Sequence, residues 1–121
     1  MWKIKSSVIN SIIELAKNAY PNEFSALLVC SKDNKVIDDI YILPATQNFK
    51  DSSFLRTDLS PMSLSIIGSV HSHPNNSNLP SNADLKFFSS KDINVIICNP
   101  FGISNIAFYN SKGAPVTLDF I

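Results

Sequence analysis

The chain has 121 residues, and its ten Lys and Arg are balanced by ten Asp and Glu, so the formal net charge is zero. A chain of this length buries about two-thirds of its unfolded surface, and 45% apolar residues can fill a core, so we expect a single domain over residues 1–121. The charge balance argues against a basic nucleic-acid-binding module, and no apolar run reaches the ~18 residues of a membrane span.

Apolar side chains at spacings of three and four residues predict a helix at the start of the chain. Ser6 or Ser7 is the expected N-cap, and Pro21 cannot continue the helix. The predicted buried face consists of Val8, Ile9, Ile12, Ile13, Ala16, Ala19 and Tyr20.

Two apolar segments follow the predicted helix. Residues 24–30 are typical of a buried strand, residues 31–35 of a turn and residues 36–43 of a second strand, which together predict a hairpin. Residues 44–61 are polar and predict a long loop, a kind of segment that is usually functional or mobile.

The second half predicts a strand over residues 65–72, a polar loop over 74–80 and a short helix over 81–90. The expected buried side of this helix carries Ala83, Phe87 and Phe88. Three further strands are predicted over residues 93–98, 103–109 and 115–121. The fold class is therefore α/β: a mixed, mostly antiparallel sheet of about six strands, flanked by an N-terminal helix and a short second helix.

The two cysteines, Cys30 and Cys98, form neither a CxxC pair nor a disulfide framework, so we expect buried free thiols in a reducing compartment. The first residues lack the apolar stretch of a signal peptide. These features favour a cytoplasmic protein without nucleic-acid or membrane partners. An unpaired edge strand and an exposed Trp2 would be compatible with a homodimer.

The only two histidines, His71 and His73, stand at i and i+2 near the end of a predicted strand, so both rings face the same side. Asp84 follows at the start of the next predicted helix. Two imidazole nitrogens and one carboxylate oxygen suit a zinc ion that keeps one position open for water.

Each part of this pattern also has a structural explanation. A histidine pair at a strand end is usually hydrogen-bonded or solvated, and Ser81 with Asp84 has the spacing of a capping box. The full pattern, HxHP followed by SxxD, is expected by chance only roughly 2 × 10⁻⁵ times in a chain of this composition. The combination therefore favours a metal site.

Of the two glutamates, Glu14 lies on the polar side of the first predicted helix and is expected to be solvated. Glu23 precedes the first buried strand. We expect it to lie near the sheet interior, where desolvation tunes a carboxylate toward general-base work. A turn-capping role explains this glutamate equally well.

At these residues the sequence resembles the JAMM family, the metalloprotease branch of the MPN domains. The family motif is a glutamate at the start of a strand, then H-[ST]-H-P, then serine and aspartate at the spacing seen here. One departure is Ala26, where many relatives have glycine, and another is the lack of a substrate-gripping insertion, which resembles the minimal archaeal and bacterial members. The matching residues are Glu23, His71, Ser72, His73, Pro74, Ser81 and Asp84.

The resemblance implies an MPN fold and a hydrolase. His71, His73 and Asp84 would hold one Zn²⁺ per chain, Glu23 would activate the zinc-bound water, and Ser81 would stabilise the oxyanion. Ser72 would point to the opposite face and be structural. The implied substrate is the peptide or isopeptide bond after the C-terminus of a ubiquitin-like or sulfur-carrier protein. Candidate walls for its extended tail are residues 46–60 and 75–80.

Three rival interpretations remain. A non-catalytic MPN-type scaffold usually lacks a histidine, the aspartate or the glutamate, all of which are present here. The facial triad of Fe(II) oxygenases usually places the carboxylate close to one histidine, unlike this chain. The DNA-repair-associated branch usually has a preceding DNA-binding helical region, which this sequence lacks. Within the hydrolase interpretation, removal of a modifier from lysine and trimming of a precursor stay equally open.

Overall fold

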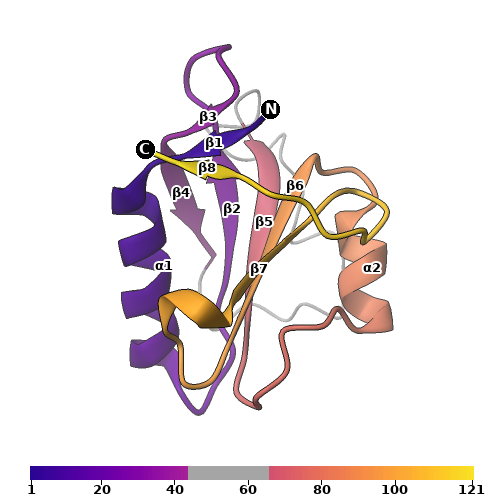
Figure 1. Ribbon diagram of the computed structural model, residues 1–121. Helices are drawn as coiled ribbons and strands as arrows, with labels where there is room; N and C mark the ends of the chain where they lie inside the picture. Colours follow the sequence, from indigo (N-terminus) through magenta and orange to yellow (C-terminus); the bar gives the residue numbers. More distant parts are fainter. Residues whose placement is uncertain (44–65) are drawn as a thin grey trace.

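The structure, a computed structural model, describes residues 1–43 and 66–121 and has a five-stranded sheet between two helices, α1 (Ser6–Ala19) and α2 (Asn82–Phe88) (Figure 1). The strand order is β4-β2-β5-β6-β7. β5 and β6 are parallel and are connected through α2, whereas the other neighbours are antiparallel. The predicted α/β class, with a mixed sheet flanked by two helices, is confirmed. The strands are β2 (Ser25–Val29), β4 (Asp39–Ile42), β5 (Ile66–His73), β6 (Ile93–Cys98) and β7 (Ile106–Tyr109).

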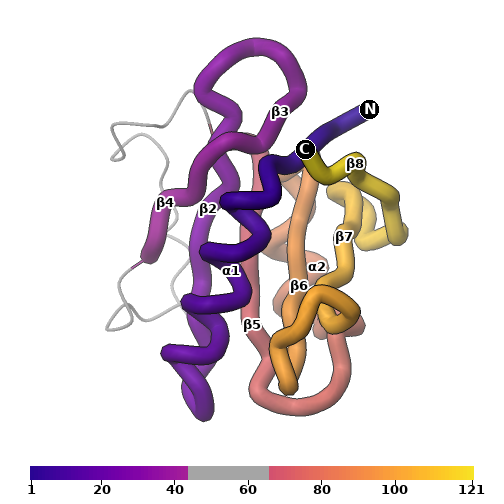
Figure 2. Tube along the Cα trace, turned by 60° about the vertical axis from the view of Figure 1, so that its left-hand side comes forward, coloured from indigo at the N-terminus to yellow at the C-terminus, as the bar shows by residue number. Residues whose placement is uncertain are grey.

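A small second sheet brings the two ends of the chain together (Figure 2). In it, β1 (Lys3–Ile4) lies between β3 (Val36–Ile37) and β8 (Asp119–Phe120), and both pairs are parallel. The strands that we expected in one six-stranded sheet are therefore divided between two sheets. The predicted hairpin remains, because β2 pairs antiparallel with β4.

Several predicted strand boundaries are wrong for local reasons. The strand expected over residues 36–43 divides at Asp38, whose carboxylate accepts hydrogen bonds from the backbone N–H and the hydroxyl of Ser31. The segment expected as a strand over 103–109 begins with a 3-10 turn, η4 (Ile103–Asn105). Of residues 115–121, only β8 is a strand. The predicted loop 44–61 lies outside the described residues.

The main core lies between α1 and the sheet. Val8, Ile9, Ile12 and Ala16 are buried on α1, as its periodicity predicts. Tyr20, which we expected on the same face, is the residue after the helix and is 50% exposed. The buried residues of α1 pack against alternate residues of three strands, among them Ala26, Val70 and Val95, each 0% exposed. The methyl group of Ala26, where many JAMM relatives have glycine, is thus part of this core.

The start of α1 differs from the prediction. Neither serine caps the helix: the N-cap is Lys5, without a side-chain bond. Ser6 is already helical, and its N–H donates to the Ile121 carbonyl oxygen at 2.7 Å, so the C-terminus satisfies this helix end. Trp2, which we expected to be exposed, is half-buried and packs on the core.

The opposite face of the sheet carries polar side chains and is covered by α2. Phe88 is fully buried there with Ile96 and Tyr109 in a smaller apolar cluster. Phe87 is half-buried, but Ala83, which we expected on the buried side, is exposed. The predicted Ser81 cap is confirmed, with Asp84 completing a capping box.

The remaining sequence expectations concern thiols and membranes. Cys98 is buried and Cys30 half-buried, and both are free. Within residues 1–43 and 66–121, neither helix has the length and hydrophobicity needed to cross a bilayer.

Candidate metal centre

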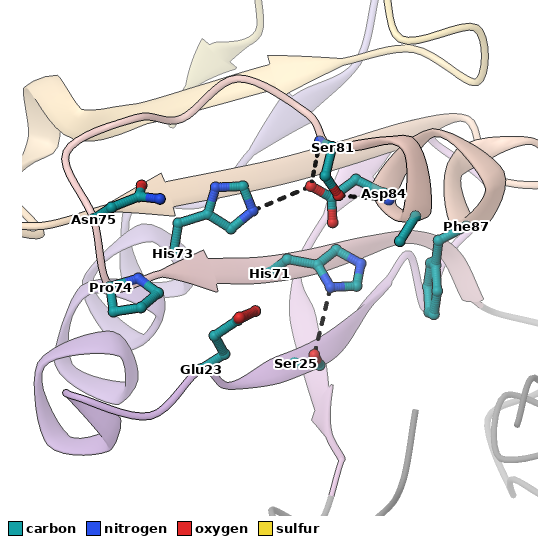
Figure 3. Close-up of a pocket in the computed structure, with 10 residues that line it drawn as sticks. Glu23, Ser25, His71, His73, Pro74, Asn75, Ser81, Asp84 and Phe87 are labelled. Carbon is teal, nitrogen blue, oxygen red and sulfur yellow. Dashed lines mark hydrogen bonds and ion pairs between the residues drawn. The ribbon is translucent and has the colours of Figure 1, made fainter. Parts of the chain in front are cut away.

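The face of the sheet under α2 opens into a pocket of about 530 Å³. All five residues predicted for the site line it: Glu23, His71, His73, Ser81 and Asp84 (Figure 3). They come from the segment before β2, from β5 and from the start of α2. Residues 23 and 84 are thus brought to one place by the pairing of β2 with β5 and by the crossover through α2.

Strand alternation explains the two histidines. His71 and His73 project from the same face of β5, while Ser72 between them projects to the other face and is 1% exposed. The Ser72 hydroxyl oxygen accepts a hydrogen bond from the Phe24 backbone N–H at 2.7 Å. The expected structural role of Ser72 therefore includes holding the residue next to Glu23 against β5.

His73 uses both ring nitrogens. Nδ1 lies 3.0 Å from the carbonyl oxygen of Ser77, to which it donates, and Nε2 lies 3.1 Å from Oδ2 of Asp84. The hydrogen bond to Asp84 raises the pKa of His73, and the charge of Glu23 acts in the same direction. A backbone carbonyl at Nδ1 directs Nε2 toward the pocket, an arrangement typical of metal-binding histidines.

The Asp84 carboxylate both bonds to His73 and takes part in the cap of α2. Oδ2 accepts the Ser81 backbone N–H at 2.8 Å, and the Ser81 hydroxyl oxygen accepts the Asp84 N–H at 3.1 Å. Burial opposes ionisation of Asp84, but hydrogen bonds from His73 and Ser81 outweigh it and lower its pKa to about 2. The hydroxyl proton of Ser81 is not used in the capping box, so it can be donated to a ligand in the pocket.

His71 has the least satisfied ring. Its Nδ1 lies 3.4 Å from the Ser25 hydroxyl, but its Nε2 is buried and has no hydrogen-bond partner among the described residues. The Phe87 ring stands edge-on to it, with centroids 4.6 Å apart. Burial lowers the pKa of His71 to about 4, so the imidazole is neutral at pH 7. A neutral imidazole nitrogen without a protein partner is a metal-ligand donor.

These donors fit zinc. The set consists of two imidazole nitrogens and one carboxylate oxygen, the ligands of open catalytic zinc sites. The 3.1 Å between His73 Nε2 and Asp84 Oδ2 is near the ~3.3 Å expected for two ligands ~2.0 Å from a tetrahedral ion. In the described part of the chain, no three His, Cys, Asp or Glu side chains converge on one ion position, so His71 stands beside the His73–Asp84 pair without completing a triad.

Glu23 differs from its predicted environment. It is exposed at the rim of the pocket rather than desolvated near the sheet interior, and its carboxylate points toward the strand that carries both imidazoles (Figure 3). Glu14 is exposed on α1, as expected.

Sequence analysis did not assign Ser25 or Phe87 to the pocket. Ser25 lies opposite His71 in the antiparallel register, and strand alternation from Glu23 could have indicated its orientation. Phe87 was predicted only as a core residue, although it also forms a wall of the pocket. Asn75, within the segment 75–80 that we expected as a wall for the substrate tail, lines the pocket from the loop after Pro74.

Residues 5–111 match the family model described as prokaryotic homologues of the JAB domain. The chain belongs to this family. A probable metalloprotease from Haloferax volcanii is 31% identical over 126 residues, which cover 98% of this chain and 78% of the relative.

Solved structures agree with this membership of the prokaryotic JAB family. A structure described as JAMM, a metalloprotease-like zinc site in the proteasome and signalosome, is 33% identical with a TM-score of 0.79, covering 100% of this chain and 98% of its own. A JAB1/MPN domain protein from Archaeoglobus fulgidus is 35% identical with a TM-score of 0.79, covering 98% of each chain. The protein is therefore a minimal prokaryotic JAMM/MPN member of a zinc metalloprotease family.

Proposed function

We propose that this JAMM-family chain hydrolyses the peptide or isopeptide bond after the C-terminus of a ubiquitin-like or sulfur-carrier protein. One observation carries the proposal. The buried Nε2 of His71, without a partner among the described residues, lies in the same pocket as the His73–Asp84 pair, with a free carboxylate at the rim. These are the groups that a zinc peptidase requires.

His71, His73 and Asp84 would hold the ion. When bound, zinc lowers the pKa of water from about 15.7 toward about 7 and polarises a carbonyl oxygen. The Ser77 carbonyl supports this role because it fixes the proton of His73 on Nδ1 and leaves Nε2 as the ligand atom.

Glu23 would act as the proton carrier. Its exposed position at the rim lets the carboxylate accept a proton from the attacking water and then deliver it to the leaving amine, which departs toward solvent. Ser81 would donate its hydroxyl proton to the oxyanion that develops on the substrate carbonyl. Its oxygen is held by the Asp84 N–H, so the donor is already oriented before substrate binds.

The shape of the molecule suits an extended tail. Among the described residues β4 is an unpaired edge of the five-stranded sheet, and an extended peptide can bind by adding a strand to such an edge. The outer side of β7 is already bonded to the segment that follows it, since the Val116 N–H donates to the Phe108 carbonyl oxygen. Phe87 of α2 and the loop after Pro74 both line the pocket, and we expect this lining to favour small residues beside the scissile bond. Modifier tails that are extended and rich in small residues meet both requirements.

Cleavage of fusions tests this proposal. The zinc-loaded protein would be incubated with linear and lysine-linked fusions of small modifiers from the same organism, so that precursor trimming and deconjugation are separate arms. We expect cleavage of at least one fusion and its loss with a chelator. Glu23→Gln should lower kcat by about a hundredfold to ten-thousandfold with zinc still bound.

Glu14→Gln is the matched control, because Glu14 is the only other glutamate and is solvated on α1. Full activity in Glu23→Gln would remove that residue from the mechanism. Zinc below about a tenth of an equivalent in protein purified without added metal would instead favour the non-catalytic scaffold.

A further inference from the structure

The loop between β5 and α2 supplies an essential contact to the candidate metal centre. Its Ser77 carbonyl oxygen lies 3.0 Å from His73 Nδ1. Ser77 is exposed, so water competes for this bond unless the loop is held in place. What holds the loop therefore influences how well His73 is oriented toward a metal.

The first half of the loop is tied to the residues after β6. The Asn99 side-chain amide donates to the Pro74 carbonyl oxygen at 3.2 Å, and the Asn99 backbone N–H donates to the Asn75 carbonyl oxygen at 2.9 Å. Asn76 returns a bond, since its amide donates to the Asn99 carbonyl oxygen at 3.1 Å.

The second half is tied to η4 and β7. The Tyr109 hydroxyl donates to the Asn78 carbonyl oxygen at 2.7 Å, and the Asn78 amide donates to the Asn105 carbonyl oxygen at 3.2 Å. Tyr109 is 4% exposed and its ring stacks on Phe88 at a centroid distance of 6.0 Å, so the hydroxyl is held by a rigid core residue. Asn78 immediately follows Ser77 in the chain. The bond from Tyr109 to the Asn78 carbonyl oxygen therefore anchors the peptide group directly after the one that carries the Ser77 carbonyl.

We propose that Tyr109 is a positioning residue for the metal site: its hydroxyl anchors Asn78 and thereby holds the Ser77 carbonyl on Nδ1 of His73. This inference rests on the proposed function for its metal, but it assigns a role to a residue that touches neither metal nor substrate. Nε2 of His73 then already faces the pocket before the ion binds. Metal binding therefore does not have to order the loop, which would lower the affinity.

Tyr109→Phe is the decisive variant, because it removes the hydroxyl and keeps the ring on Phe88. Substitution of a partner that orients a metal-binding histidine typically costs 10–100-fold in metal affinity, and Tyr109 acts one step further out. We expect zinc affinity, measured by chelator competition, to fall about threefold to tenfold. Tyr20→Phe is the control, because Tyr20 is 50% exposed and its hydroxyl has no partner in the described part of the chain.

A spectroscopic readout separates positioning from general destabilisation. The chain has only two histidines, so ¹⁵N-histidine NMR of the zinc-loaded protein observes just His71 and His73. In Tyr109→Phe, the Nδ1–H of His73 should exchange with water at least about threefold faster, with no change at His71. Asn99→Ala should act in the same direction and replaces the first variant if that one does not fold.

The outcomes distinguish this inference from the proposed function. Wild-type affinity and wild-type exchange in folded Tyr109→Phe would overturn the role of Tyr109 while leaving the zinc site intact. Equal acceleration at both histidines would also overturn it, because it would indicate general loosening. Failure of the unmodified protein to bind zinc would contradict the proposed function and this inference together.

Discussion

On the side of the sheet that faces α1, β5 presents Val70, which is completely buried among apolar side chains. One residue later the same strand presents His71 to the pocket under α2 (Figure 3). The same change occurs along β2, where Ser25 faces the pocket and Ala26 the core. A shift of one residue in the pairing of these strands would exchange the two faces. The register of β5 with β2 and β6 therefore places the apolar core on one face and the candidate metal site on the other.

The difference between adjacent residues can be tested directly, and the largest effect is expected at His71. His71→Ala removes one of three donors, so bound zinc should fall from about one equivalent to below about a tenth. Because its Nε2 has no hydrogen-bond partner among the described residues, the metal-free protein should lose little stability. Metal analysis and urea unfolding would measure both. Retention of stoichiometric zinc would mean that the ion is held elsewhere.

The next effect concerns the start of α2. Ser81→Ala removes the hydroxyl that we expect to donate to the oxyanion, and kcat should fall about a hundredfold to a thousandfold while zinc remains bound. The variant also loses a helix cap, which costs about 1 kcal/mol of stability. Ser81→Thr keeps both functions and should retain most activity. If Ser81→Ala reduces stability but not kcat, the serine is a cap only.

Val70→Ala is the matched variant on the apolar face. Removing two buried methyl groups and leaving a cavity should lower the free energy of unfolding by about 2.5 kcal/mol. Zinc affinity should stay within about twofold, because the side chain points away from the pocket. Calorimetry and chelator competition test this. A large loss of zinc affinity would show that the two faces are coupled rather than independent.

Between pH 7 and pH 4, acid should act chiefly on the face of the sheet that carries His71 and His73. Burial lowers the pKa of His71 from its ordinary 6.5 to about 4. The unfolded chain therefore takes up this proton first, and the free energy of unfolding of metal-free protein should decrease as the pH falls from 6.5 to about 4. The raised pKa of His73 contributes in the opposite direction, with stability that is present at low pH and lost as the pH rises through that pKa.

The net decrease should be about 2 kcal/mol between pH 7 and pH 4. Urea unfolding in the presence of a chelator measures it. Val70→Ala should keep this pH dependence, whereas His71→Ala should flatten it. An unchanged slope in His71→Ala would assign the acid sensitivity to another group.

The local pattern of apolar residues was sufficient for the elements whose burial is regular. α1 shows it through apolar spacings of three and four residues, and β2 and β6 through continuous apolar segments that are buried at every position. The division of residues 36–43 was not predictable in this way. The division depends on the hydrogen bond between Ser31 and Asp38 and on the pairing of Val36 with Lys3. Lys3 is distant in the sequence, so no local pattern indicates this pairing.

The convergence of the candidate site residues on one pocket followed from the sequence more readily than the sheet did, because HxHP and SxxD are each short local motifs. Glu23 was assigned to the site correctly as a pocket residue but to the wrong environment. The neighbouring residue Phe24 is bonded to Ser72 of β5, 48 positions along the chain, and the exposure of the Glu23 side chain depends on this long-range contact. The Asn99 and Tyr109 contacts to the loop after Pro74 left no sequence signal, because they involve backbone carbonyls.

The double use of Asp84 has a consequence for how the protein acquires metal. Its carboxylate caps α2 through the Ser81 N–H whether or not an ion is bound, so the helix end does not need zinc to form. Domains of the zinc-finger kind unfold when the ion is withdrawn. Here we expect the chain to stay folded when it releases its ion. The supply of zinc would then determine the fraction of molecules that are active, and not the fraction that are folded.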